Sequence, residues 1–287
     1  MAIVLGDNQY GKAEVRLLHV SRDDAQDVIT DLNVSVALSG ELTATHLTGD
    51  NSDVLTTDAQ KNTVFAFARE GGVGEIEDFA LRLARHFVAS QAAISFARVT
   101  VEQYPWERLA GHSFVRSGRE VRTATISHDG TDSWVVSGVS GLTALNTAGS
   151  EFWGFARDRY TTLAETTDRI LATAVNARWR HASVAESAGC WGESYCAARD
   201  LMLEAFADTH SYSLQQTLYA MGARVLDGRP EIAEVRLSLP NKHHFEVDMS
   251  PFGLESQHDV FYAADRPYGL IEGTVTRDDA PPPGKAW

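Results

Sequence analysis

The order of strand-like and helix-like patterns occurs twice along this chain, and that repetition limits its possible folds more than any other feature. In the first half, alternation or helical spacing marks segments 12–21, 27–38, 64–68, 76–90, 94–101 and 115–126. In the second half, the matching segments are 134–146, 169–182, 195–209, 213–226, 232–239 and 270–275. Each half predicts the order β-β-α-α-β-β, which is typical of an antiparallel sheet with both helices on one face.

Local similarity supports a duplication. The segments ISFARVTV (94–101) and IAEVRLSL (232–239) share one pattern, and each follows the second helix of its half. We therefore predict an α+β protein of two tandem units, each a four-stranded antiparallel sheet with two helices on one face. The expected bounds are 1–133 and 134–277. Residues 278–287 contain three successive prolines and are expected to form a mobile tail.

Two such units in tandem leave free sheet edges, and exposed edges tend to pair with other chains. We expect a homo-oligomer in which several sheets close into a barrel-like tunnel. Interfaces between subunits are common places for ligand pockets, so we expect functional residues there.

Composition excludes several classes of partner. The chain has 287 residues and a formal net charge of −14, which disfavours binding to nucleic acid. No stretch approaches the ~20 apolar residues of a membrane span, and the N-terminus lacks a signal-peptide pattern. The only two cysteines, Cys190 and Cys196, could form a local bridge, but a reduced pair is favoured. These features predict a soluble cytoplasmic protein.

One stretch concentrates polar chemistry at the end of a strand. In LSLPNKHHFEVD (237–248), Pro240 is expected to end ladder pairing, because proline lacks an N–H donor. Asn241, Lys242, His243 and His244 follow it at once. Residues at the end of a rigid strand are held firmly enough to act on a ligand. We therefore predict a pocket around Asn241 and His243.

Two further candidates lie in the first half. Lys12 opens a strand; a lone lysine is usually a solvated surface residue, but burial would lower its pKa and make it a proton acceptor. Thr56, Thr57 and Asp58 precede a helix. They could be a plain N-cap, or they could direct free N–H groups at an anion.

Three candidates lie in the second half. Phe152 is either core packing or a flat ring on which a planar ligand stacks. Arg169 could form a weak surface ion pair with Asp168, or its guanidinium could hold a planar anion. Gln215 could face solvent or pair its carboxamide with an adjacent donor and acceptor.

Other site types are disfavoured. The histidines and cysteines show no zinc-ligand spacing, no Gly-rich phosphate loop follows a strand, and no Gly-x-Ser-x-Gly elbow is present. Spacing alone predicts a pocket for a small planar anion, without a metal, and names no reaction.

The same residues belong to segments by which the chain resembles the uricase (urate oxidase) family, its actinobacterial type above all. The segments, in the family's order, are YGKAEVR, TTDAQKNTV, QYPWERL, SEFWGFARDRYTTLAETTDRIL, SLQQTLY and LPNKHHFEVD. The resemblance implies the tunnelling fold (T-fold), four subunits and active sites at subunit interfaces. It also implies oxidation of urate by dioxygen and water to 5-hydroxyisourate and hydrogen peroxide, with no metal and no organic cofactor.

The resemblance implies a role for each candidate. Lys12 and Thr57 correspond to the family's proton-removing dyad, with Thr57 supplied by a neighbouring subunit, and His243 completes the relay. Phe152 corresponds to the ring under the purine, and Arg169 and Gln215 correspond to the pair that grips its edge, assisted by the backbone of Leu214. Asn241 corresponds to the residue that holds dioxygen and later water, and Asp58 to a backbone N–H donor to the purine.

Two other functions remain open from the sequence. A pterin- or purine-processing enzyme on the same fold would need zinc ligands or a catalytic cysteine. A non-catalytic purine-binding oligomer would need the pocket but not Lys12, Thr57 and His243.

Overall fold

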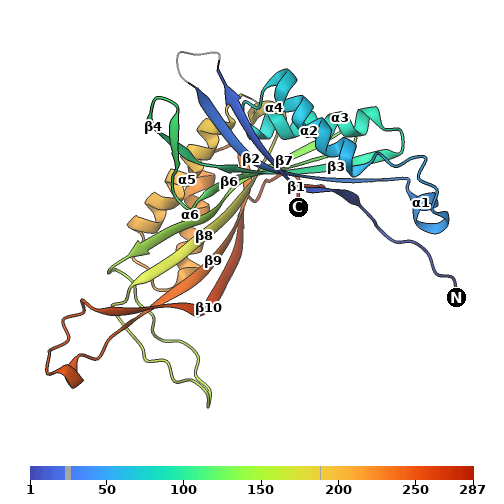
Figure 1. Cartoon of the computed structure of the whole chain (residues 1–287). Helices are drawn as coiled ribbons and strands as arrows, with labels where there is room; N and C mark the ends of the chain where they lie inside the picture. Colours follow the sequence, from blue (N-terminus) through green and yellow to red (C-terminus); the bar gives the residue numbers. More distant parts are fainter. Residues whose placement is uncertain (23–26, 188) are drawn as a thin grey trace.

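One eight-stranded antiparallel sheet organises the protein, whose structure is a computed structural model describing residues 1–22, 27–187 and 189–287. The strand order is β1-β2-β3-β6-β7-β8-β9-β10. The strands are β1 Tyr10–Ser21, β2 Val28–Gly40, β3 Ile94–Tyr104, β6 Val121–His128, β7 Ser133–Asn146, β8 Leu171–His181, β9 Ile232–Glu246 and β10 Phe261–Thr276. Figure 1 shows a curved sheet that runs from the blue β1 to the red β10.

Four longer helices cover one face of the sheet and leave the other face open (Figure 1). They are α2 Thr57–Gly71, α3 Ile76–Ser90, α5 Trp191–Asp208 and α6 Leu214–Gly228. Helix α2 contacts β1, α3 contacts β3 and β6, α5 contacts β7, and α6 contacts β9 and β10. Helical spacing explains these contacts: Phe79, Leu83 and Phe87 lie on one side of α3 and are fully buried.

The buried residues form two cores, one for each half of the chain. The first joins β1, β2, β3 and β6 to α2 and α3, and the second joins β7 to β10 with α5 and α6. Val135 of β7 and Trp191 of α5 belong to the first core, so the two halves meet there. The prediction of an α+β protein of two tandem units is confirmed. The exact bounds at 133 and 277 stay a prediction, which the two cores support.

Several local predictions were incomplete because short elements show too few periods. Residues 40–53, expected to be turns, contain helix α1 (Thr43–Thr48), which buries no side chain. The strand expected at 115–126 is divided at Gly118, which has a φ of 64°. Its first residues belong to a small hairpin of β4 (Trp106–Ala110) and β5 (Ser113–Arg116). Two further short elements are α4 (Val184–Ser187) and the 3-10 turn η1 (Ser250–Phe252).

The expectation that Pro240 ends strand pairing was wrong. Strand β9 continues to Glu246, and Pro240 lies opposite Leu270 of β10. On its other side, pairing with β8 resumes at Asn241, opposite Thr173. A proline is tolerated where its missing N–H is not required by the ladder.

The proline-rich tail lies against the sheet, and its expected mobility stays a prediction. Arg180 donates to the carbonyl of Pro281 at 2.9 Å, and Arg98 donates to the carbonyls of Lys285 and Trp287, each at 2.9 Å. Because Arg98 belongs to β3 and Arg180 to β8, the tail touches both halves.

A buried polar cluster also joins the halves. Glu77 of α3 is fully buried and accepts hydrogen bonds from Arg122 and Ser137, both at 2.7 Å. The Ser137 hydroxyl also lies 3.1 Å from Nε2 of His181. Burial lowers the pKa of His181 to about 4, so its ring is neutral at pH 7.

None of the helices that the structure describes is long and apolar enough to cross a membrane.

Candidate functional site

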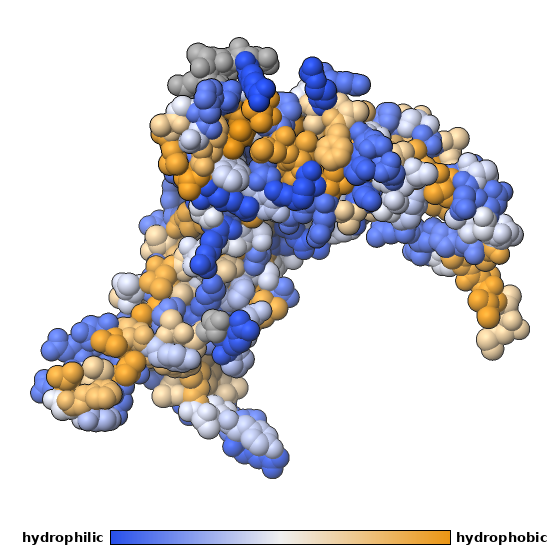
Figure 2. All heavy atoms as spheres, in the orientation of Figure 1, coloured by the Kyte–Doolittle hydropathy of each residue, from blue (hydrophilic) through white to orange (hydrophobic). Residues whose placement is uncertain are grey.

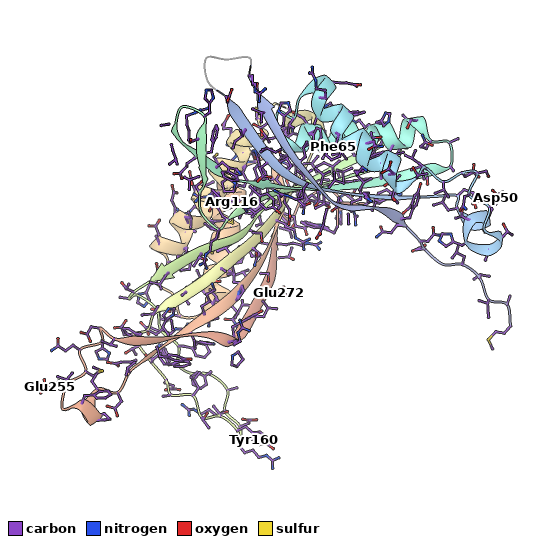
Figure 3. All side chains as sticks on the ribbon, viewed as in Figure 1. Asp50, Phe65, Arg116, Tyr160, Glu255 and Glu272 are labelled. Carbon is purple, nitrogen blue, oxygen red and sulfur yellow. The ribbon has the colours of Figure 1, made fainter. Side chains whose placement is uncertain are left out.

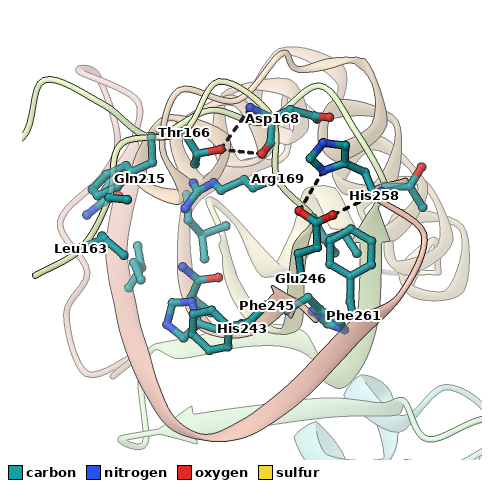
Figure 4. A pocket seen from close by; sticks show the side chains of 18 residues that line it. Leu163, Thr166, Asp168, Arg169, Gln215, His243, Phe245, Glu246, His258 and Phe261 are labelled. Carbon is teal, nitrogen blue, oxygen red and sulfur yellow. Dashed lines mark hydrogen bonds and ion pairs between the residues drawn. The ribbon is translucent and has the colours of Figure 1, made fainter. Parts of the chain in front are cut away.

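A cavity of about 420 Å³ lies in the second half, between β9, the start of α6 and the segment after β7. Six predicted site residues line it: Phe152, Arg169, Leu214, Gln215, Asn241 and His243. Figure 4 shows Arg169, Gln215 and His243 around this space. These residues come from three separate stretches of sequence, so the fold is what brings them together.

The strand geometry of β9 aims two of these side chains. Asn241 and His243 are two positions apart, and alternate residues of a strand point to the same face. The Asn241 backbone is held on both sides, by Thr173 of β8 and Gly269 of β10. Residues in the middle of a three-strand ladder are fixed in position, which suits groups that must hold a small ligand.

Arg169 supplies the positive charge of the cavity. Its Nε donates to the Ser150 hydroxyl at 3.1 Å, and its backbone N–H donates to the Ser150 carbonyl at 3.0 Å. The guanidinium carbon lies 5.1 Å from the centre of the Phe152 ring. Burial lowers the pKa of Arg169 from its ordinary value, but an arginine remains charged at any physiological pH. A single oriented cation in a partly desolvated pocket favours an anionic ligand.

Phe152 is held as a flat surface at the cavity wall. Its backbone exchanges two hydrogen bonds with Thr166, at 2.8 and 3.0 Å. The ring stacks on Phe155 with centroids 5.0 Å apart and planes 16° apart. A ring fixed by both its backbone and a neighbouring aromatic side chain can serve as a stacking platform.

The start of helix α6 brings amide groups to the cavity. Ser213 is the N-cap, and its hydroxyl accepts the N–H of Gln216 at 3.2 Å. The N–H groups of Leu214 and Gln215 belong to the first turn and have no intrahelical partner. Gln215 is exposed towards the cavity, whereas Leu214 is buried. This end of the helix can therefore donate backbone and carboxamide hydrogen bonds to an anion.

His243 is a neutral base in this setting. Burial lowers its pKa below the ordinary value, and electrostatic interactions with Arg169 and His244 lower it further. Its ring stacks on Phe245 with centroids 5.8 Å apart. A neutral imidazole can accept a proton or a hydrogen bond from a ligand or a water molecule.

The other three predicted residues lie at the opposite end of the sheet. Lys12 is in β1, and Thr57 and Asp58 open α2, which packs on β1. The N-cap of α2 is Thr56, whose hydroxyl accepts the N–H of Ala59 at 3.1 Å. Lys61 and, more weakly, Lys12 hold the pKa of Asp58 below its usual value. Lys12 therefore lies within electrostatic reach of the first turn of α2.

Six strand spacings separate β1 from β9 in the sheet order. At about 4.8 Å for each spacing, the two groups of residues are roughly 30 Å apart along the sheet. One chain therefore holds two separate groups, which we call the lysine half-site (Lys12, Thr57 and Asp58) and the arginine half-site (the six cavity residues).

Sequence reasoning missed several residues that line the cavity: Leu163, Glu246, His258, Phe261 and Ile271. Glu246 bonds His258 at 3.0 Å across the loop between β9 and β10 (Figure 4). Phe261 lies opposite Glu246 in the β9–β10 ladder. Continuing the alternation of β9 beyond Pro240 would have indicated Phe245 and its neighbours, but the loop contacts needed the structure.

The residues that the structure describes contain no group of three or more His, Cys, Asp or Glu side chains that could hold a metal ion. Cys190 and Cys196 are free thiols at exposed positions.

A family model described as uricase matches residues 8–127 and 135–272. The chain is 50% identical to the uricase of Arthrobacter globiformis over 287 residues, which cover 99% of this chain and 94% of that protein. It is 37% identical to the uricase of Dictyostelium discoideum, over 94% of this chain and 96% of that one.

Solved structures agree with these matches. The crystal structure of uricase from Arthrobacter globiformis superposes with a TM-score of 0.94 at 51% identity, covering 98% of each chain. The urate oxidase of Bacillus sp. TB-90 superposes with a TM-score of 0.82 at 26% identity, over 94% of this chain and 100% of that one.

Proposed function

The chain belongs to the uricase family, and from this premise we propose that it is a urate oxidase. It oxidises urate with dioxygen and water to 5-hydroxyisourate and hydrogen peroxide. Urate gives two electrons to dioxygen, and water supplies the oxygen atom added to the purine. The observation that carries the proposal is the convergence of a cation, a flat ring, an amide pair and a neutral imidazole in one cavity.

The arginine half-site binds the substrate. Urate is a planar anion, so its face stacks on Phe152 and its edge meets the Arg169 guanidinium and the Gln215 carboxamide. The backbone N–H of Leu214 adds a donor from the start of α6. These contacts stabilise the dianion that forms when urate loses a second proton, which is electrostatic catalysis.

The lysine half-site and β9 manage protons and oxygen. Lys12 takes the second proton through the Thr57 hydroxyl, and His243 completes the relay to water. Asn241 holds dioxygen, and later water, over the purine ring, while the Asp58 N–H donates to the purine. The dianion is electron-rich enough to reduce dioxygen itself, so the reaction requires only binding, orientation and proton transfer from the protein.

Association completes the site. The β1 edge of one subunit pairs near the β10 edge of the next, which brings a lysine half-site to each arginine half-site and closes the sheets into a tunnel. A homotetramer forms in this way, with active sites at subunit interfaces. Exposed apolar side chains along and beyond the edges support this arrangement: Met1, Ile3, Val4, Leu18, Tyr262 and Leu270. Figure 2 shows the apolar N-terminal end projecting beyond the rest of the molecule.

The enzyme works in the cytoplasm.

An assay of urate loss tests the proposal. Purified protein should remove the ultraviolet absorbance of urate in air and release one hydrogen peroxide for each urate, with or without a chelator. Urate that binds but persists in air would instead support a non-catalytic purine-binding oligomer. Activity that depends on stoichiometric zinc would support a pterin- or purine-processing enzyme of the same fold.

A further inference from the structure

Tyr10 lies at the start of β1, two residues before Lys12. The two side chains share one face of the strand because alternate residues point the same way. The pairing register shifts just after Lys12, where Glu14 has a φ of 57°, and this bulge returns Val15 to the core face. Tyr10 and Leu55 both pack against the first core, and the Leu55 backbone neighbours the Tyr10 hydroxyl, so Tyr10 anchors the start of the strand that carries Lys12.

Gln60 lies in α2, three residues after Thr57 and on the same side of the helix. It is fully buried, and its Nε2 donates to the carbonyl of Leu55 at 3.3 Å. Its Oε1 has no hydrogen-bond partner among the described residues. A buried carboxamide with an unsatisfied oxygen costs free energy, and an apolar side chain would fill this position at less cost. The presence of glutamine here therefore calls for another role.

The Tyr10 hydroxyl faces this carboxamide. It is buried, and its polar neighbours are the Leu55 backbone and the Gln60 side chain, at a geometry short of a regular hydrogen bond. Desolvation raises the pKa of Tyr10, so the hydroxyl keeps its proton and can donate it. The Gln60 contact lowers the pKa of Tyr10, as an amide donor that faces the phenolic oxygen does, so a small shift would let the second Nε2 proton bond the Tyr10 oxygen.

We propose that Tyr10 and Gln60 are positioning residues that fix Lys12 relative to Thr57. Tyr10 belongs to the strand that carries Lys12, and Gln60 belongs to the helix turn that carries Thr57. The pair thus joins strand β1 to helix α2 beside the lysine half-site. This inference rests on the proposed urate oxidation, because it assigns a purpose to the alignment of that dyad. A misplacement of about 1 Å at a reacting group can cost on the order of 100-fold in rate.

The test uses Tyr10→Phe and Gln60→Met, which remove the polar atoms and keep the volume. Tyr219→Phe, at an exposed position of α6, is the matched control. With urate as substrate, each of the two variants should lower kcat about tenfold and change KM less than about twofold, because Arg169 and Phe152 are untouched. The pH profile of kcat should shift in both. The double variant should lose little more than the worse single variant, because both break one link.

Thermal melting and subunit assembly are measured in parallel, and kcat is expressed per urate-binding site. A purely structural role would lower the melting temperature but leave kcat per site and the pH profile unchanged, which would overturn the inference. If Gln60→Met does not fold, Tyr10→Phe decides alone, since it removes a single oxygen. Failure of the wild type and Tyr219→Phe to consume urate would instead contradict the proposed function.

Discussion

Arg169 is the residue whose setting most narrows the choice of ligand. Ser150 accepts a hydrogen bond from its guanidinium, the Phe152 ring lies beside it, and the side chain lines the cavity. The sequence indicated a choice between a surface ion pair with Asp168 and an anion clamp. The structure places Arg169 in the cavity wall, half-buried and bonded to Ser150, which favours the clamp.

Replacing Arg169 should therefore weaken urate binding more than turnover. Truncating one partner of a buried charged pair costs about 3 kcal/mol, so Arg169→Ala should raise the Kd for urate on the order of 100-fold. Arg224→Ala is a matched control, because that partly exposed arginine pairs with Asp208 at 3.4 Å and does not line the cavity. Equilibrium binding of urate under anaerobic conditions measures the effect, and an unchanged Kd would remove Arg169 from the clamp.

The lowered pKa of His243 predicts how kcat declines on the acidic side of the pH profile. Its pKa lies below the ordinary 6.5 because of burial and then of Arg169 and His244. The ring is neutral above this depressed pKa and gains a proton as pH falls through it, which removes the acceptor. We expect kcat to hold at pH 7 and to decline only below pH 6.5. His243→Gln should have lower kcat and a flatter acid limb; an unchanged limb would place the titrating group elsewhere.

At the scale of elements, long and regular patterns were predicted well and interrupted ones were not. Helix α3 lies at 76–90 as expected, because a four-turn apolar face leaves little choice of bounds. The predicted strand ended before Pro240, whereas β9 continues to Glu246, because sequence alone does not show which N–H groups a ladder needs. Figure 3 shows two segments with weak patterns projecting from the sheet, one with Tyr160 and one with Glu255.

The buried cluster of Glu77 in α3, Ser137 in β7 and His181 in β8 predicts how stability depends on pH. His181 has a pKa of about 4 when folded and near 6.5 when unfolded, so protonation below pH 6.5 favours the unfolded chain. At pH 7 the ring is neutral in both the folded and the unfolded chain, so its protonation does not affect stability. As the pH falls from 6.5 to 4, the free energy of unfolding decreases by about 3 kcal/mol. The raised pKa of Glu77 acts in the opposite direction, because the folded state then holds a proton more tightly.

A difference measurement separates these two groups. His181→Gln keeps a hydrogen-bonding side chain beside Ser137 but does not titrate. Its unfolding free energy should depend less on pH between 6.5 and 4 than that of the wild type, with Glu77 common to both. His112→Gln, at an exposed histidine, should follow the wild type. Equal pH slopes in His181→Gln and wild type would contradict a buried neutral histidine.

At the scale of the whole molecule, the two half-sites lie at opposite ends of one sheet (Figure 1). A single chain therefore holds both half-sites but does not bring them together. The six cavity residues come from one unit and the lysine half-site from the other, so the duplication itself separates them. Their assigned roles stay predictions until variants are measured.

Mixing two inactive variants tests shared sites directly. Lys12→Met damages the lysine half-site, and Arg169→Ala damages the arginine half-site, so at urate concentrations well below the raised Kd of Arg169→Ala each homo-oligomer should have little activity. After co-refolding in equal amounts, random association should restore about a quarter of the sites. Each restored site combines the intact arginine half-site of a Lys12→Met chain with the intact lysine half-site of an Arg169→Ala chain. Activity that stays at the level of the separate variants would show that each chain completes its own site.

The sequence by itself determined the class of fold and the family, because period-two and period-3.6 patterns and the spaced segments are local properties of the chain. It also supplied the chemical types of the site residues. Only the tertiary structure decided that Phe152, Arg169, Gln215 and His243 share one cavity, that Lys12 lies at the far end of the sheet, and that the tail packs across both halves. The physical reason is that strand pairing and burial join residues far apart in sequence, which local patterns do not encode.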